Sequence, residues 1–157
     1  MMCIKKCIRS IAILALLAPL LSAAQSPDDP RFRETFQRRY TALKNVAPDM
    51  VVMELRDRVE LVASRGSQVG AASNDRRVRG FESELLRGLQ AAHCPNAATG
   101  TARPAPAVID KINAAANAQR LRTQPDDVAE LSALAQRLLD SQPRERWCAL
   151  KSLDEIR

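Results

Sequence analysis

Glycine and aromatic residues are scarce in this chain of 157 residues, which holds five Gly, three Phe, one Tyr and one Trp. Strands favour aromatic and β-branched residues, whereas the abundant Ala, Leu, Arg, Gln and Glu are good helix formers. Every long segment also spaces its apolar residues by three and four rather than by two. We therefore predict an all-α fold, an irregular bundle of five or six short helices with one disulfide.

Histidine is almost absent, since His93 is the only one. A catalytic triad or a Cys–His pair would have to use it, but a lone His at a helix end more often contacts the terminal carbonyls. A zinc site needs three or four ligands, and His93, Cys94 and Cys148 supply three only if the two cysteines stay reduced. No glycine-rich phosphate loop is present either. These absences predict a protein that is not an enzyme and binds no cofactor and no metal.

Paired carboxylates leave one enzymatic alternative open, a small hydrolase of cell wall or lipid. Glycosidases place two carboxylates roughly 5–10 Å apart across a cleft. Such a site would need at least two of the following groups: Glu54, Asp57, Glu82 and Glu84. A further alternative is a carrier of small molecules whose apolar cavity is lined by Met50, Met53 and Phe81.

The one long apolar run lies near the N-terminus, at residues 11–21, after Lys5, Lys6 and Arg9 and before the small residues 22–24. This order is typical of a secretory signal, and the run is shorter than the roughly 20 residues that a transmembrane helix needs. We predict a signal peptide at 1–24, cleaved after Ala24 or nearby. Residues 25–157 then form one helical domain, periplasmic or secreted, without a stable membrane span.

Of the four cysteines, Cys3 and Cys7 leave with the predicted signal peptide. The two that stay, Cys94 and Cys148, are not in a Cys-x-x-Cys motif and would enter an oxidising compartment. We therefore predict a disulfide between them. It would close a loop of about 55 residues and stabilise the fold by roughly 4 kcal/mol.

Proline and polar turn residues divide the remaining chain into six predicted helices. Their approximate ranges are 30–47, 48–64, 75–92, 105–122, 125–141 and 143–156. Residues 65–74 and 95–106 are predicted loops, the second rich in proline. In the second helix we expect Met50 and Met53 to widen the inward apolar stripe, and Glu54 to pair with Arg58 one turn later. Gly80 and Gly88 would allow another helix to approach the third.

The densest cationic cluster is Arg76, Arg77 and Arg79, a candidate contact for an acidic partner. Because the chain is predicted to be exported, we expect no nucleic-acid partner. The features together predict a non-catalytic binding or accessory protein of a bacterial-type cell envelope. It would act by contact with another envelope protein, as secretion accessory factors and toxin-immunity proteins do.

Overall fold

The computed structural model describes residues 30–65, 70–94 and 107–157. These ranges hold six α-helices, one 3-10 helix and no strand, so the predicted all-α fold is confirmed. The helices are α1 (Pro30–Leu43), α2 (Pro48–Ser64), α3 (Ala71–His93), α4 (Val108–Ala118), α5 (Pro125–Ser141) and α6 (Arg144–Ala149), followed by the 3-10 helix η1 (Leu153–Glu155). The predicted signal peptide 1–24 and the predicted loop 95–106 lie outside the described residues.

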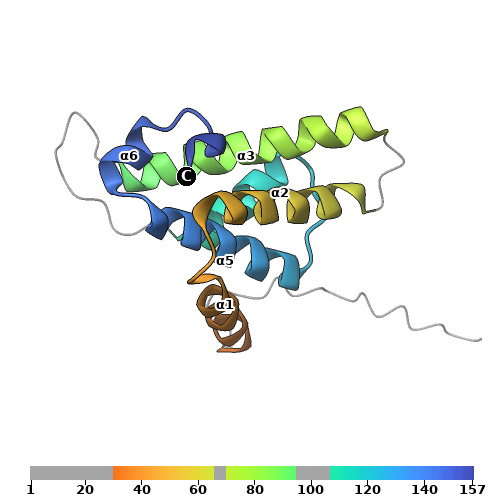
Figure 1. The fold of residues 1–157 in the computed structure, drawn as a ribbon. Coiled ribbons are helices and arrows are strands. Elements are labelled where there is room, and N and C mark those ends of the chain that lie inside the picture. Colours follow the sequence, from red (N-terminus) through yellow and green to blue (C-terminus); the bar gives the residue numbers. More distant parts are fainter. Residues whose placement is uncertain (1–29, 66–69, 95–106) are drawn as a thin grey trace, which may run out of the picture.

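Helix α2 lies between α3 and α5, and α4 packs against both α3 and α5 on the other side of the core (Figure 1). Helix α1 lies at the margin of the bundle and packs on α5. The largest fully buried side chains include Trp147, Phe81, Leu55 and Leu85. Burial of a side chain of this size is worth about 1.5–3 kcal/mol, so each of these residues contributes substantially to the stability of the bundle. In the described ranges every helix is too short or too polar to serve as a membrane span.

The bounds of α2 and α5 agree with the prediction, whereas those of the other helices differ. Helix α1 ends at Leu43, before the predicted end at residue 47. Helix α3 begins at Ala71, within the predicted loop 65–74, because Ala71 and Ala72 are strong helix formers. Helix α4 ends early, at Ala118. The predicted sixth helix is divided into α6 and η1, because backbone at Ser152 is extended and its hydroxyl accepts a hydrogen bond from the Asp154 N–H at 3.1 Å.

The end of α4 is set by a Schellman motif. The N–H of Leu121 donates to the carbonyl of Ala116 at 2.9 Å, and the N–H of Arg120 donates to that of Asn117 at 3.0 Å. This motif needs a left-handed residue, and Arg120 takes that place with a φ of 53°. The chain therefore leaves the helix four residues before the predicted end.

Helices α3 and α4 come close at the two glycines of α3. A Cβ atom on Gly88 would lie 3.3 Å from Cδ of Lys111, and one on Gly80 would overlap the side-chain amide of Gln119. The predicted close approach of a neighbouring helix at these glycines is confirmed, and the neighbour is α4.

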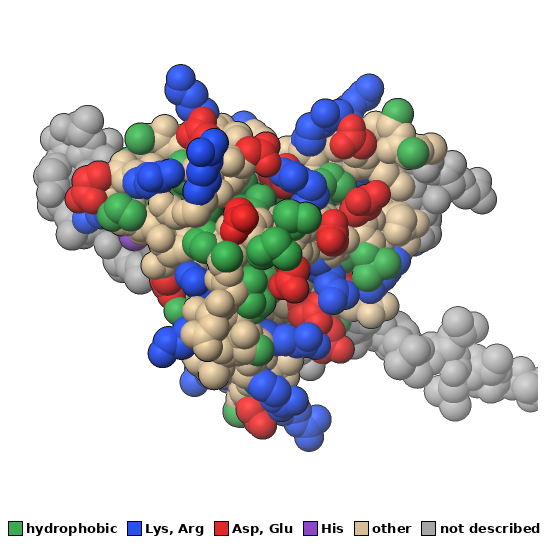
Figure 2. Space-filling model, in the orientation of Figure 1, with side chains coloured by type: hydrophobic (Ala, Val, Ile, Leu, Met, Phe, Trp, Pro, Cys, Tyr) green, Lys and Arg blue, Asp and Glu red, His purple; other side chains and the backbone are tan. Residues whose placement is uncertain are grey.

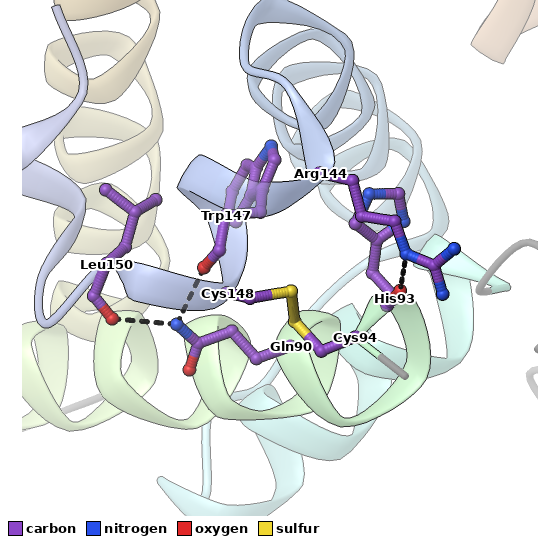
Figure 3. Close-up of a disulfide and its surroundings, with 7 residues drawn as sticks. All are labelled: Gln90, His93, Cys94, Arg144, Trp147, Cys148 and Leu150. Atoms are coloured by element: carbon purple, nitrogen blue, oxygen red, sulfur yellow. Dashed lines mark hydrogen bonds between the residues drawn. A yellow bond between two sulfur atoms is a disulfide. The ribbon is translucent and has the colours of Figure 1, made fainter. Parts of the chain in front are cut away.

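The disulfide joins the end of α3 to α6 (Figure 3). The sulfur atoms of Cys94 and Cys148 are 2.08 Å apart, as the predicted pairing requires. Beside it, the Gln90 side-chain amide donates to the carbonyls of Trp147 at 2.9 Å and Leu150 at 2.7 Å. The C-terminal segment is thus held to α3 by a covalent bond and by hydrogen bonds.

Trp147 anchors the same segment from inside the core. Its side chain is fully buried, and its indole N–H donates to the carbonyl of Leu139 in α5 at 2.8 Å. At the other end of α6, Arg144 donates to the carbonyl of His93 at 2.8 Å (Figure 3). Helix α6 has only six residues, so these tertiary contacts position it rather than its own helical hydrogen bonds.

Candidate functional site

The side of α2 that faces away from the core carries the exposed large hydrophobic side chains of the described residues. Met50, Met53 and Leu61 are 49%, 53% and 46% exposed, respectively. Successive residues of a helix are turned by about 100°, which places these three opposite the fully buried Leu55 and Val59. The expectation that Met50 and Met53 would widen the inward stripe is therefore wrong.

Four carboxylates lie among these apolar side chains. Asp49, Glu54, Asp57 and Glu60 are exposed, and within the described ranges none of them forms an ion pair. We call these seven residues the outer face of α2: Asp49, Met50, Met53, Glu54, Asp57, Glu60 and Leu61. Figure 2 shows apolar and acidic side chains side by side over this helix.

The two arginines of α2 lie at the edges of the outer face and are both engaged elsewhere. Arg58 pairs with Glu130 of α5 at 2.5 Å, so the predicted pair between Glu54 and Arg58 does not form. The Glu130 side chain is only 13% exposed, and a carboxylate with so little water attracts a cation more strongly than exposed Glu54 does. The outer face therefore keeps its negative charge.

Arg56 is engaged at the opposite edge. It pairs with Glu82 of α3 at 2.8 Å and with Asp154 of η1 at 2.9 Å. Hydrogen bonds to Asp154 and then Glu82 raise the pKa of the guanidinium above its ordinary value. This cation therefore joins three elements and does not offset the carboxylates of the outer face.

A hollow of about 410 Å³ borders the outer face, between α1, α2 and α5. Leu43, Leu61 and Leu134 supply apolar lining, and Glu54 and Asp57 stand on its α2 side. The polar lining also includes Glu130, which accepts from Arg58 and from Arg39 of α1 at 2.7 Å. The outer face thus continues into a hollow that has both apolar and charged walls.

The four carboxylates of the hydrolase hypothesis do not assemble around one cleft. Glu54 and Asp57 line the hollow beside α1, whereas Glu82 lines a second hollow of about 440 Å³ beside η1. Glu84 pairs with Arg87 on α3 at 2.8 Å. Only Glu54 and Asp57 remain as a pair for such chemistry, and their catalytic role stays a prediction.

The residues proposed for a carrier cavity are also apart. Phe81 is fully buried in the core, whereas Met50 and Met53 are on the exposed side of α2. The expectation that these three would line one cavity is wrong, because the helical turn places Met50 and Met53 opposite the buried face.

The three arginines of the cationic cluster differ in their surroundings. Arg77 donates to the backbone carbonyls of Ala63, Gln119 and Arg120, and Arg79 pairs with Asp75 on the same helix. Arg76 is exposed. Contact of this cluster with an acidic partner stays a prediction, and Arg76 and Arg79 are its exposed members.

His93 and the two cysteines are not available together for nucleophilic attack or metal binding. Cys94 and Cys148 are joined to each other, so neither is free to attack a substrate or to ligate a metal. Within the described ranges, no three His, Cys, Asp or Glu side chains converge as metal ligands.

Sequence reasoning missed Leu61 and Glu130 as members of the site. Leu61 follows Asp57 by one turn and Met50 by three, and this spacing could have revealed a second stripe opposite Leu55 and Val59. Glu130 gives no such signal, because its two cation partners come from α1 and α2.

Comparison with protein-family models, with curated proteins and with solved structures finds no match to this chain. Function is therefore inferred from the side chains described above.

Proposed function

We propose that this chain is an exported, non-catalytic binding or accessory protein of a bacterial-type cell envelope, acting by contact with another protein. The observation that carries the proposal is the outer face of α2. Met50, Met53 and Leu61 are each about half exposed on one helix, and apolar surface in water costs free energy that a partner can recover. Grouped exposed apolar residues with polar neighbours are typical of protein contact sites.

Two features support the compartment. The N-terminal order of charge, apolar run and small residues is that of an export signal. The Cys94–Cys148 disulfide fits the periplasm or the exterior, because disulfides persist in oxidising surroundings and are rare in the cytosol.

Two features support a non-catalytic role. The candidate thiol nucleophile Cys94 is bound to Cys148. Of the four candidate carboxylates, Glu82 and Glu84 are engaged with arginines away from the hollow that Glu54 and Asp57 line. A role such as toxin immunity or secretion support needs a surface that covers another protein, and a small helical domain supplies one.

Photocrosslinking in the producing cell tests this proposal. A photoreactive amino acid would replace, one at a time, three exposed residues of separate helices: Met53, Arg76 and Glu145. We expect at least one position to give a discrete adduct with another protein, and excess unlabelled chain to suppress it. Absence of an adduct at all three positions would refute the proposal.

An enzyme assay tests the hydrolase alternative beside it. The purified chain would be incubated with peptidoglycan and with phospholipid vesicles, and the released products measured. We expect no release. Hydrolysis that is lost in Glu54→Gln/Asp57→Asn would replace the binding proposal with the hydrolase.

A further inference from the structure

The outer face of α2 is long, narrow and acidic. Met50 and Leu61 are eleven residues apart, which corresponds to about 16 Å along a helix, or three turns. Four carboxylates flank the apolar residues, and both arginines of the helix are held by acids of other elements. A partner that covers this face must bring apolar side chains and positive charge together.

We propose that this face binds a cationic amphipathic helix of the partner protein, an inference that rests on the proposed function. The apolar side of that helix lies along Met50, Met53 and Leu61. Its Lys or Arg side chains pair with Glu54, Asp57 and Glu60, and one large apolar side chain enters the hollow between α1 and α2.

The shape of the surface favours a helix as the bound element. The described ranges contain no strand whose edge could extend a sheet, whereas helices recognise each other through apolar residues spaced by three and four. Methionine side chains are flexible and polarisable, so they adapt to the contours of such a helix.

The negative charge of the outer face favours a basic partner over an acidic one. Carboxylates at Asp49, Glu54, Asp57 and Glu60 repel an anionic membrane or an acidic protein and attract lysine and arginine. The three arginines beside the face, Arg39, Arg56 and Arg58, pair with three acids, Glu82, Glu130 and Asp154. These six charges cancel, so the four carboxylates keep their net negative charge. The face therefore selects a basic partner.

The hollow gives the partner one defined anchor. Its volume of about 410 Å³ is large enough for one large apolar side chain of the partner, and Leu43, Leu61 and Leu134 would contact that side chain. A few buried anchors of this kind carry most of the free energy of many protein contacts.

The chain offers a direct probe, because its four methionines are Met1, Met2, Met50 and Met53. With carbon-13 in the methionine methyl groups, NMR reports on two residues of the outer face without any substitution. The probe is a helical peptide of about 14 residues made of Leu at helical spacing and Lys elsewhere. The comparison peptide has Glu in place of every Lys.

We expect the Lys peptide to shift the Met50 and Met53 methyl signals and the Glu peptide to leave them in place. Fluorescence anisotropy should give a dissociation constant in the micromolar range, rising at least threefold between about 50 and 200 mM NaCl as charge is screened. Unshifted Met50 and Met53 signals at saturating Lys peptide would overturn the inference.

Charge-reversal variants provide the matched control. Glu54→Lys/Asp57→Lys should weaken binding of the Lys peptide by roughly tenfold or more. Glu34→Lys/Glu145→Lys changes the net charge equally, but in α1 and α6, and should change binding less than about twofold. Equal effects of the two variants would overturn the inference. Met53→Ser/Leu61→Ser should also weaken binding, and thermal unfolding verifies that each variant is folded.

The experiments distinguish a failure of this inference from a failure of the proposed function. Crosslinks to a protein at Arg76 but not at Met53, with no effect of the peptide on Met50 and Met53, would keep the binding function and refute this surface. Binding of a second copy of the chain to the face, seen as dimers abolished by Glu54→Lys/Asp57→Lys, would also refute the inferred partner.

Discussion

Arg77 of α3 donates a hydrogen bond from Nη2 to the carbonyl oxygen of Arg120, 2.9 Å away and just beyond α4. The same guanidinium donates to the carbonyls of Gln119 at 3.2 Å and of Ala63, near the end of α2, at 3.0 Å. The last carbonyls of a helix have no partner within it. One cation therefore serves the ends of two helices and joins them to a third.

Arg77→Ala should lower the free energy of unfolding by roughly 2–3 kcal/mol, because it leaves two partly buried carbonyls and one exposed carbonyl without their donor. Denaturant unfolding followed by circular dichroism measures the loss. The control is Arg76→Ala, an exposed neighbour, which should change stability by less than about 0.5 kcal/mol. Equal losses in the two variants would show that the carbonyl contacts contribute nothing.

Ser132→Ala should stabilise the protein. The Ser132 side chain is fully buried in α5, and its hydroxyl has no hydrogen-bond partner in the described structure. Removal of an unsatisfied buried hydroxyl recovers about 1–3 kcal/mol of desolvation cost. Exposed Ser83→Ala gains only helix propensity, about 0.5 kcal/mol. Thermal unfolding of both variants measures the difference. A stabilisation by Ser132→Ala that is no larger than that by Ser83→Ala would contradict the prediction.

Cys94→Ser/Cys148→Ser should lower the free energy of unfolding by roughly 2–4 kcal/mol. Helix α6 should nevertheless stay packed against α3 and α5. The contacts of Gln90, Arg144 and Trp147 persist without the disulfide. Because Trp147 is the only tryptophan, its fluorescence reports on this segment alone. We expect an unchanged emission maximum in native buffer and an earlier transition in denaturant. A red-shifted native spectrum would mean that α6 depends on the disulfide.

Tyr40 should titrate above the ordinary tyrosine pKa. Its hydroxyl donates to Asp140, and this hydrogen bond is the main cause that raises the pKa, followed by burial and by the charge of Asp140. Since the neutral phenol is favoured in the folded state, its contribution to stability is complete below about pH 10, the unfolded value. It is lost as pH rises through the folded pKa.

Ultraviolet titration measures this directly, because Tyr40 is the only tyrosine. Asp140→Ala should lower the pKa toward its ordinary value, whereas Glu145→Ala should leave the titration curve in place. An unchanged curve in Asp140→Ala would contradict the assigned cause.

Export should leave a shortened chain whose N-terminus is Gln25 or a neighbouring residue. Cell fractionation, N-terminal sequencing and intact mass test this together. We expect the processed chain in the envelope or the medium. Its mass should be two hydrogens below that of the reduced chain, because the disulfide has formed. Recovery of the intact chain from the cytosol with free Cys94 and Cys148 would contradict both the signal peptide and the compartment.

Local sequence features predicted the fold where they agreed with tertiary packing. Pro48 and Pro125 each occupy the first position of a helix, where proline is favoured, and α2 and α5 begin there as predicted. The Schellman turn at Arg120 escaped prediction, because left-handed backbone is normally signalled by glycine. The tertiary contacts of α6 and η1 likewise have no local signature.

The outer face of α2 was harder to predict for a geometric reason. Met50 is adjacent in sequence to buried Val51, yet the helix turns it about 100° away. An apolar residue beside an apolar stripe is easily counted in that stripe. Glu54 and Arg58 have the spacing of a helical pair, but the nearly buried Glu130 attracts Arg58 instead. Partners distant in sequence thus determined which charges stay exposed.

The Cys94–Cys148 disulfide also keeps the chain covalently joined after proteolytic cleavage between the two cysteines. The two residues are 54 positions apart, and a single cut anywhere between them opens the covalent ring without releasing a fragment. The severed pieces stay tethered at α3 and α6, so a nicked molecule remains one particle until a reductant cleaves the bond between half-buried Cys94 and exposed Cys148.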